Sequence, residues 1–395
     1  MLIWECIFFL SIFIIFYNYA GYALIVYVIN KIAPKFNKIA VSEYYPTVSF
    51  IVAAYNEEQI IEKKIENSLR QVYPSEKIEF IFITDGSADG TVSIIERYPE
   101  IKLMHNDERK GKSSALNRAV LAAQNDILII SDANTFLNTE AVKYITLHYK
   151  DELTGGVAGE KRVVESPDDA DGIGSREGLY WRYESFLKKI DSDFYSVVGA
   201  AGELFSVQRK LYESISESVI LDDFVISLKT AQKGYRIIYE PRAYAMELSS
   251  MSLKDEQKRK IRIAAGGFQA IKMLLPLFRF WKHPRLTFLY VSHRVLRWTL
   301  SPLCLILVLI LNIMLVLKTN NSFYTFCLVM QIVFYVAAFI SNYISSNSKF
   351  RVLKFTAYFV FMNVSVIQGF FRFLFNKQAS AWEKVGRSSA AIKTD

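Results

Sequence analysis

The chain has 395 residues, which is more than one ordinary domain needs, and 52% of them are hydrophobic. Its formal net charge is +8, and the stretch from Lys254 to Arg297, with eleven Lys/Arg against two acids, carries +9, so the rest of the chain is close to neutral. No nucleic-acid-binding motif accompanies this basic stretch, so we expect no nucleic acid as a partner; a membrane surface or an anionic ligand fits the charge. Cys6, Cys304 and Cys327 lie far apart in apolar runs, which excludes a zinc-ligand spacing.

The first apolar run, from Cys6 to Ile29, predicts a membrane-spanning helix within residues 1–32. No Lys or Arg precedes the run, so it lacks the basic start of a secretory signal peptide. Lys31, Lys35 and Lys38 follow it. Because basic residues concentrate on the cytoplasmic side of membranes, we expect the N-terminus outside and the following domain in the cytoplasm.

Residues 44–252 are expected to form an α/β domain, because short apolar runs alternate with helical patterns. Continuous apolar runs are typical of buried parallel strands. The alternation predicts a doubly wound, mostly parallel sheet, in which ligands bind at the carboxyl ends of the strands. The predicted strands are 48–54, 78–84, 101–104 and 127–131, with helices at 61–69, 92–97 and 113–123 between them.

Polar residues follow the first two predicted strands. Ala54 to Glu58 comes after the first strand and Thr84 to Thr91 after the second. Asp, Ser and Gly in such places also form tight turns that cap the next helix, and this explains either cluster alone equally well. In the functional interpretation, Asp85 accepts a hydrogen bond from the N–H of a base such as uracil.

Two further clusters offer ligands for phosphate and for a metal ion. Lys112 lies beside Gly111 at a predicted helix start, where a cation and free backbone N–H groups suit a diphosphate. Asp132 and Asn134 follow the strand 127–131, and their oxygen atoms together with a diphosphate suit Mg²⁺ or Mn²⁺. The alternatives are a solvated basic loop for the first cluster and a simple turn for the second.

Two adjacent acids, Asp222 and Asp223, begin an amphipathic pattern that runs to Gly234. Acids in the first turn of a helix suit the positive end of its dipole, and this alone explains them structurally. The functional interpretation is a general base that takes a proton from an attacking hydroxyl group.

The basic stretch, residues 253–297, contains an amphipathic part from Phe268 to Tyr290 that Pro276 and Pro284 interrupt. Apolar side chains mix there with Lys and Arg, as in segments that lie in the headgroup region of a membrane. We therefore predict an interfacial segment. The other interpretation is a surface helix of the middle domain.

Residues 298–375 are expected to hold C-terminal transmembrane helices. Runs at 298–317 and 323–344 are long enough to span, and a third at 355–371 is at the lower limit. Basic residues both precede and follow the third run, and one crossing cannot place both groups in the cytoplasm. Either this segment is a re-entrant hairpin or the polar tail, residues 376–395, lies outside.

In this order and at these spacings the clusters resemble those of the processive family-2 glycosyltransferases, the group of the cellulose, hyaluronan and poly-N-acetylglucosamine synthases. The resemblance covers about residues 46–262. It implies a GT-A type domain inserted between transmembrane helices. It also implies an inverting transfer of a sugar from a UDP-sugar to a growing extracellular or capsular polysaccharide, at the cytoplasmic face of a plasma membrane, the inner membrane of a bacterium.

The resemblance implies roles for the donor-side residues. Tyr55 and Glu57 line the nucleoside pocket, Asp85 binds the uracil ring, and Lys112 contacts the diphosphate. Asp132 and Asn134 stand where the family has its Asp-x-Asp metal motif, and Asp132 also belongs to the donor site. The second motif position is Asn here, which keeps a carbonyl oxygen and loses a charge.

Asp223 matches the last acid of the family's Thr-Glu-Asp motif and is implied to be the catalytic base. Ala201, Gly202 and Asp222 are implied to bind the acceptor. The family's Gln-x-x-Arg-Trp motif is matched by Gln257 and Lys260, followed by Ile in place of Trp. The resemblance assigns both residues to the donor diphosphate.

The missing Trp favours a rival reaction, which is a single sugar addition to a lipid-linked acceptor such as a polyprenyl-phosphate glycan. A catalytically dead relative or a membrane scaffold is the non-enzyme alternative. The expected partners are the UDP-sugar, a carbohydrate or lipid-linked acceptor and membrane lipids, with a homo-oligomer or partner export proteins supplying further helices for a polymer channel.

Overall fold

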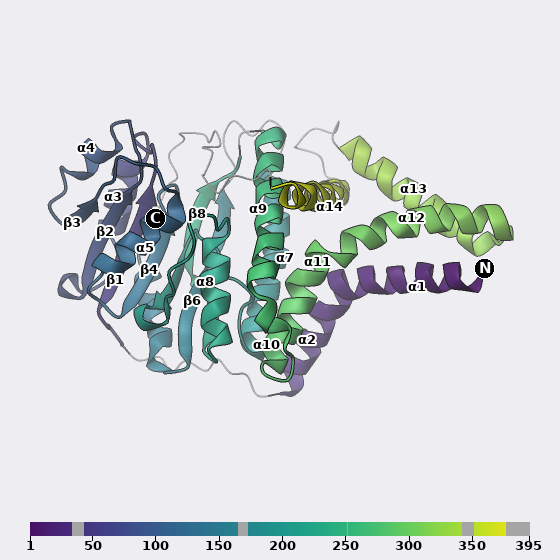
Figure 1. The fold of residues 1–395 in the computed structure, drawn as a ribbon, viewed down its shortest axis with the longest axis horizontal. Helices are drawn as coiled ribbons and strands as arrows, with labels where there is room; N and C mark the ends of the chain where they lie inside the picture. Colours follow the sequence, from purple (N-terminus) through teal and green to yellow (C-terminus); the bar gives the residue numbers. More distant parts are fainter. Residues whose placement is uncertain (34–42, 165–172, 251, 342–350, 377–395) are drawn as a thin grey trace.

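The computed structural model describes residues 1–33, 43–164, 173–250, 252–341 and 351–376. Lys35, Lys38 and all of the predicted polar tail except Asn376 lie outside the described residues. The described part combines an α/β domain with long apolar helices that extend from one side of it (Figure 1).

The domain is built on one mixed, mostly parallel sheet with the strand order β3-β2-β1-β4-β7-β6-β8-β5. The pairs β1·β2, β2·β3, β1·β4 and β6·β8 are parallel, and β7 and β5 pair antiparallel with their neighbours. The doubly wound sheet predicted from the apolar runs is confirmed. The strands are β1 (Val48–Ala54), β2 (Ile78–Thr84), β3 (Ile101–Met104), β4 (Ile127–Asp132), β5 (Phe136–Leu137), β6 (Thr154–Val164), β7 (Phe205–Gln208) and β8 (Arg236–Leu248).

Helices cover both faces of the sheet, and β1 is therefore buried along its whole length. Phe50 and Val52 pack in the core with residues of α3, and their neighbours Ile51 and Ala53 pack in the opposite core with residues of α5. This alternation follows from the two-residue period of a strand. The domain helices are α3 (Ile61–Leu69), α4 (Thr91–Ile95), α5 (Lys112–Ala122), α6 (Ala141–Thr146), α7 (Ile173–Phe194), α8 (Asp222–Gln232) and α9 (Leu253–Met273).

The strand register brings three polar side chains to one edge of the sheet. Ala54 pairs with Thr84, and Ala53 pairs with Asp132. The residues that follow the first two strands, Tyr55 and Asp85, therefore lie at the same edge as the end of β4. This is the carboxyl edge, where ligands bind in doubly wound sheets.

Four described helical segments are long and apolar enough to cross a membrane. The first is a continuous run of α1 (Leu2–Phe16), a π-helical turn at 17–21 and α2 (Tyr22–Ile32). The others are α12 (Leu300–Thr319), α13 (Ser322–Ile340) and α14 (Arg351–Leu374). Phe8 of α1 packs against α12 and Tyr324 of α13, and the three helices α1, α12 and α13 project together from the domain (Figure 1).

A buried set of charged side chains joins the domain to the membrane helices. Asp191 of α7 accepts a 2.5 Å hydrogen bond from the Tyr22 hydroxyl of α2 and forms a 2.6 Å hydrogen bond with His293. Glu184, about two turns earlier on α7, pairs with Arg294 over 2.9 Å and also with Arg297. Buried carboxylates need such partners, because an uncompensated charge in a protein interior is strongly unfavourable.

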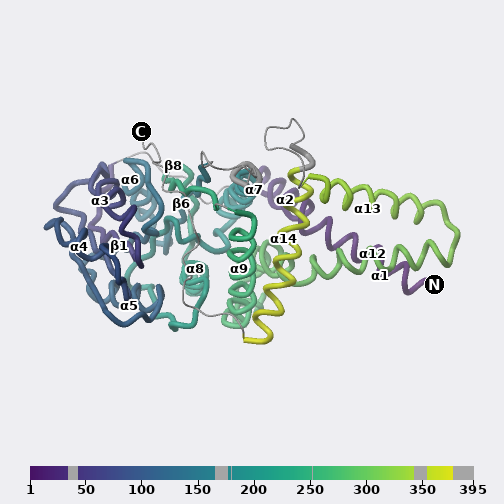
Figure 2. Tube along the Cα trace, turned by 90° about the horizontal axis from the view of Figure 1, so that it is seen from above, coloured from purple at the N-terminus to yellow at the C-terminus, as the bar shows by residue number. Residues whose placement is uncertain are grey.

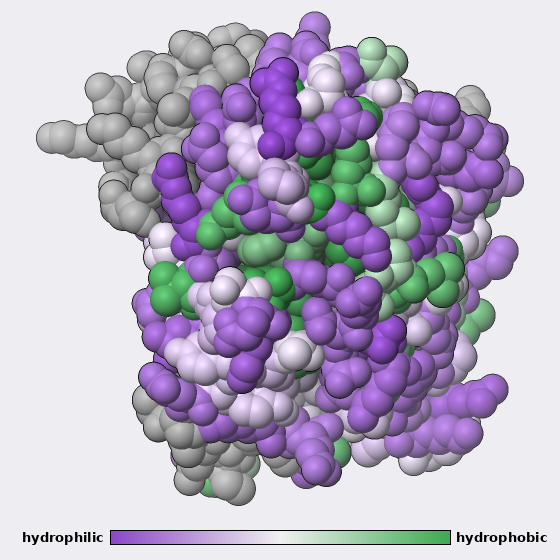
Figure 3. All heavy atoms as spheres, turned by 90° about the vertical axis from the view of Figure 1, so that its left-hand side faces the viewer, coloured by the Kyte–Doolittle hydropathy of each residue, from purple (hydrophilic) through white to green (hydrophobic). Residues whose placement is uncertain are grey.

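The segment predicted to be interfacial is partly core and partly exposed. Leu274 and Leu277, around the end of α9, are buried in the domain core. Phe280 and Trp281, just before α10 (Pro284–Tyr290), are 64% and 68% exposed. The end of the domain that faces away from the apolar helices is mainly hydrophilic, with an apolar strip across its centre (Figure 3).

Candidate functional site

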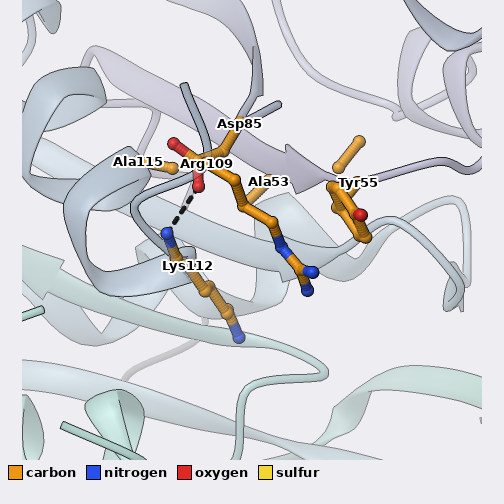
Figure 4. A pocket seen from close by; sticks show the side chains of 8 residues that line it. Ala53, Tyr55, Asp85, Arg109, Lys112 and Ala115 are labelled. Carbon is orange, nitrogen blue, oxygen red and sulfur yellow. Dashed lines mark hydrogen bonds between the residues drawn. The ribbon is translucent and has the colours of Figure 1, made fainter. Parts of the chain in front are cut away.

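A small, partly open pocket lies at the carboxyl edge of the sheet. Its residues come from the end of β1, the turn after β2 and the start of α5 (Figure 4). The Arg109 guanidinium lies 3.8 Å from the centre of the Tyr55 ring, so the two side chains stack at the pocket. The lining residues are Ala53, Ala54, Tyr55, Asp85, Arg109, Gly111, Lys112 and Ala115.

Asp85 holds the loop that leads into α5. Its Oδ2 accepts hydrogen bonds from the backbone N–H groups of Lys110 (2.8 Å) and Gly111 (2.5 Å), and its Oδ1 accepts one from Arg118 (3.0 Å). Gly111 has a φ of +94°, which glycine adopts without strain. The turn lets the chain enter α5 directly, so Lys112 becomes the first residue of that helix.

Glu57 lies in the turn after β1 and is 7% exposed. Its backbone N–H donates a 2.8 Å hydrogen bond to the Thr91 hydroxyl at the start of α4. This bond joins the turn after β1 to the turn after β2, and so fixes one wall of the region next to Tyr55. Glu57 does not itself line the pocket.

Lys112 is the centre of an acidic cluster. Its Nζ donates a 2.6 Å hydrogen bond to Asp132 Oδ1 at the end of β4 and lies 3.7 Å from Asp222 Oδ2 at the start of α8. A cation at the pocket is thus surrounded by acids from two other elements. Asp132 lies 20 positions after Lys112, Asp222 lies 110 positions after it, and the fold brings the three side chains together.

Gly202 lies against the same cluster. A Cβ atom placed on it would come within 3.0 Å of Lys112 Nζ, 3.4 Å of Asp132 Oδ2 and 3.5 Å of Asp223 Oδ2. The carbonyl group of its neighbour Ala201 accepts a 3.3 Å hydrogen bond from the Leu204 N–H, so the segment is a turn. The lack of a side chain at 202 leaves the charged groups accessible from this turn.

Burial and neighbouring charges shift the pKa values of the cluster. The pKa of Asp223 is raised to about 7 by burial and by the charge of Asp222, while Lys112 opposes the rise. Burial also raises the pKa of Asp132 above its ordinary value, against the effect of Lys112. Burial lowers the pKa of Lys112, but the neighbouring acids outweigh it and leave that pKa above its usual range. Lys112 therefore stays charged.

Asn134 follows β4 and is 8% exposed. Its Nδ2 donates a 3.3 Å hydrogen bond to Glu247 Oε1, and its Oδ1 is buried with no hydrogen-bond partner among the described residues. A buried acceptor without a partner is costly unless a ligand satisfies it. This free oxygen beside the Asp132 turn fits a divalent cation, which prefers oxygen ligands.

The two α9 residues matched to the Gln-x-x-Arg-Trp motif lie elsewhere. Gln257 donates a 3.2 Å hydrogen bond to Gln368 of α14, in an open groove between α9 and α14. Lys260 is buried, 3.1 Å from Glu256 and 3.8 Å from Glu177. Neither contacts the Lys112 cluster in the described structure, although both belong to the helix that packs behind it.

Arg262 of α9 was not predicted from the sequence. Its pKa responds to the charges of the acids around Lys112. Burial lowers its pKa, and the charges of Asp222, Asp132 and Asp223 counteract that shift. Its Nε is buried without a hydrogen-bond partner among the described atoms. The helical period could have indicated Arg262, because a residue two positions after Lys260 lies on a different face of α9. The stacking of Arg109 on Tyr55 was not predicted, because a single Arg in a basic loop belongs to no recognisable motif.

The sequence is similar to those of known glycosyltransferases. Residues 49–216 match the family described as Glycosyl transferase family 2. A poly-β-1,6-N-acetyl-D-glucosamine synthase of Staphylococcus aureus (strain COL) is 30% identical over 57% of this chain and 55% of that protein. A probable glycosyltransferase of Bacillus subtilis (strain 168), YdaM, is 25% identical over 62% of this chain and 60% of that protein. The chain therefore spans little more than half the length of these curated relatives.

Among solved structures, a mannosyltransferase from Pyrobaculum calidifontis in complex with GDP-Man and Mn²⁺ has a TM-score of 0.70. The likeness covers 94% of this chain and 100% of that chain at 22% identity, and at this identity it establishes the fold alone. The strand order, the family match and the sequence relatives agree. The chain has a GT-A-like α/β fold, its residues 49–216 match glycosyltransferase family 2, and it is similar in sequence to a polysaccharide synthase.

Proposed function

We propose that this chain is an inverting glycosyltransferase that moves a sugar from a UDP-sugar donor to a growing extracellular or capsular polysaccharide at the cytoplasmic face of the membrane. The observation that carries the proposal is the meeting of Lys112, Asp132 and Asp223 around Gly202. It combines a phosphate-binding cation with a carboxylate of raised pKa, next to a pocket at the carboxyl edge of the sheet.

The pocket is the proposed nucleotide site. A flat base fits beside the Tyr55 ring, where the Arg109 guanidinium now stacks. The Asp85 carboxylate has lone pairs beyond those used by the loop, and we assign them to an N–H of the uracil ring. Glu57 supports the turn that carries Tyr55. Lys112, at the start of α5, offers its charge and nearby backbone N–H groups to the diphosphate.

Asp132 and Asn134 are the proposed ligands of a Mg²⁺ or Mn²⁺ ion. The unpartnered Oδ1 of Asn134 is the structural reason for including it. When bound, the ion would neutralise negative charge on the leaving diphosphate. Lys112 supplies a second positive charge at the same place. Because it already pairs with Asp132, it holds that carboxylate charged and oriented in the absence of donor.

Asp223 is the proposed catalytic base. In the inverting reaction the acceptor hydroxyl attacks the anomeric carbon, the bond to the diphosphate breaks, and the hydroxyl proton passes to the Asp223 carboxylate. A pKa of about 7 suits a base that must be ionised and yet able to hold a proton. Asp222 raises that pKa, and Ala201 with Gly202 leaves room for the acceptor to approach.

Arg262 adds a third cation to the donor side. It faces the charges of Asp132, Asp222 and Asp223 from α9, and its unpartnered Nε is suited to a phosphate oxygen. We also propose that Gln257 and Lys260 contact the donor diphosphate, although both side chains would have to move to reach it.

The alternative acceptor is a lipid-linked glycan such as a polyprenyl-phosphate sugar. One observation favours it. Ile261, which stands where the related synthases have Trp, lines the groove against α14. No aromatic platform for a sugar ring is therefore provided at that position of α9.

The apolar helices place the enzyme in a membrane, and we propose the plasma membrane of a bacterium with the catalytic domain in the cytoplasm. Lipids surround the exposed sides of these helices. A polymer would need a wider passage than α1, α12 and α13 enclose by themselves, so we propose association with further copies of the chain or with export proteins.

The test is UDP release by the purified, detergent-solubilised chain with a panel of UDP-sugars and Mg²⁺ or Mn²⁺. We expect metal-dependent release from one donor, lost in Asp223→Asn and Asp132→Ala and retained in Glu100→Gln, a matched change at an exposed acid far from the cluster. Product sizing separates polymer from single addition. If wild-type protein neither binds UDP nor releases it from any donor, the proposal is wrong.

A further inference from the structure

The last apolar helix, α14, runs in a different direction from the other apolar helices. In Figure 1, α1, α12 and α13 extend away from the domain, while α14 is seen end-on beside α9. In Figure 2, turned by 90°, α14 runs across the molecule beside α9, and α1, α12 and α13 again project outward. By length and composition α14 could span a membrane, but it runs roughly perpendicular to α1, α12 and α13.

Specific contacts fix α14 to the catalytic domain in this orientation. Gly369 packs so closely on α9 that an added Cβ would lie 2.9 Å from the Ala265 nitrogen. The Gln368 Oε1 atom accepts a hydrogen bond from Gln257 of α9 over 3.2 Å, and the Asn363 Oδ1 atom accepts one from the Tyr19 hydroxyl over 2.9 Å. These contacts hold α14 against α9 in the direction that Figures 1 and 2 show.

The two sides of α14 differ in character. Several polar side chains turn toward the protein: Lys354 is 5% exposed, Asn363 7% and Ser365 1%. Large apolar side chains turn outward on another side. The exposed apolar residues on that side of α14 are Val364, Phe370, Phe371 and Leu374. An apolar side that the protein leaves uncovered suits contact with lipid.

We propose that α14 does not span the membrane but lies in the plane of its cytoplasmic interface, with its apolar side in the lipid. The inference rests on the proposal that α1, α12 and α13 cross the membrane. It explains the basic residues on both sides of this segment, because a helix in the interface keeps both of its ends in the cytoplasm. The partner of the exposed surface is the headgroup and upper acyl region of the lipid.

The same arrangement gives the protein a consistent topology. Phe9 of α1 stacks on Phe323 of α13, and the Tyr324 hydroxyl donates to Glu5, so the N-terminus and the α12–α13 turn lie at one end. With that end outside, α13 returns to the cytoplasm, α14 stays there, and the tail begins on the side of the catalytic domain.

The decisive measurement is the depth of three nitroxide labels on one side of α14 in reconstituted full-length protein, at Val360→Cys, Val364→Cys and Phe371→Cys in a background free of native cysteines. Matched labels at Phe323→Cys, Val333→Cys and Phe339→Cys report on α13. The outer labels are 11 positions apart on α14 and 16 on α13, or about 16 and 24 Å along a helix. We expect the α14 labels to share one shallow depth, while the α13 labels step through the bilayer.

If the α14 labels step through the bilayer as the α13 labels do, the interfacial assignment is wrong. If the α13 labels share one depth, the membrane embedding itself fails, which is a separate result. Impermeant maleimide on intact cells gives a second readout. Asn320→Cys, in the α12–α13 turn, should react at once, and Asn376→Cys, after α14, only once the cells are permeabilised. Reaction of both in intact cells would overturn the proposal.

Discussion

Lys112 Nζ lies 2.6 Å from Asp132 Oδ1, so the first residue of α5 is bonded to the last residue of β4. Both side chains are largely shielded from water, with 22% and 17% of their surfaces exposed. A pair of this kind keeps a charged donor and a charged acceptor aimed at one point before any substrate arrives. Such preorganisation is what stabilises developing charge in an enzyme site.

Gly202→Ala should reduce turnover with little effect on folding. The new Cβ would lie 3.0 Å from Lys112 Nζ, the end of a flexible side chain, which can shift at small cost. A displaced charge in the site should lower kcat by about 10–100-fold. The control is Gly178→Ala, where a Cβ meets nothing within 4 Å. Equal kcat values for both variants would show that the turn at 202 does not border the reaction.

The rate should depend on pH through Asp223. Its pKa is raised to about 7 by burial, and only the ionised form can accept a proton. As pH falls below 7, kcat should fall about tenfold per unit, and above 7 it should level off. Donor affinity, measured over the same range, should change much less. A rate that stays constant from pH 5 to 7 would remove Asp223 from the role of base.

Arg262→Ala should weaken use of the donor more than any change at the exposed end of α9. Loss of a charge-assisted hydrogen bond to phosphate should cost about 1.5–3 kcal/mol, or about 10–100-fold in kcat/KM. Lys258→Ala is the control, because that side chain is 67% exposed and 4.0 Å from its acidic neighbour. Lys260→Ala tests the motif match directly. A greater loss in Lys260→Ala than in Arg262→Ala, without unfolding, would favour the motif match.

Restoring an acid at position 134 should not simply strengthen metal binding. Asn134 Nδ2 donates to Glu247, which also pairs with Lys161 and Arg259 in a buried charged cluster. Asn134→Asp places a carboxylate against Glu247 and removes that bond, which should lower the free energy of unfolding by about 1–3 kcal/mol. Asn134→Ala should instead raise the Mn²⁺ concentration needed for half-maximal activity. Thermal unfolding and Mn²⁺ titrations check both, and a more stable Asn134→Asp would contradict the first.

Strand positions could be predicted to the residue where a continuous apolar run ends in polar residues. The predictions for β1, β2 and β3 are confirmed. β1 is buried along its whole length and the second half of β2 is buried, so their apolar runs end where the strands reach the polar edge of the sheet. Antiparallel β7 and the short β5 gave no such run, so their place in the sheet came only from the fold. The carboxyl-edge rule then brought Asp132 and Lys112 together as expected.

The residues on α9 show that a motif match predicts a site residue less reliably than its position on the helix surface does. The match to Gln257 and Lys260 relied on distance along the chain, but Lys260 pairs with Glu256, and Arg262 is the α9 residue whose charged form Asp222, Asp132 and Asp223 stabilise. In the same way, the apolar composition of α14 predicts contact with lipid and contains no information on direction. Direction came from Gly369 and its packing on α9.

The charged junction between α7 and the helices that enter the membrane has a practical consequence. Glu184 pairs with Arg294 and Arg297, and Asp191 is hydrogen-bonded by His293 and by Tyr22 of α2. His293, Arg294 and Arg297 come from the segment that leads into α12. A fragment ending at residue 252 would lose these three partners and uncover that side of α7, so the protein has to be produced, purified and assayed with its apolar helices attached.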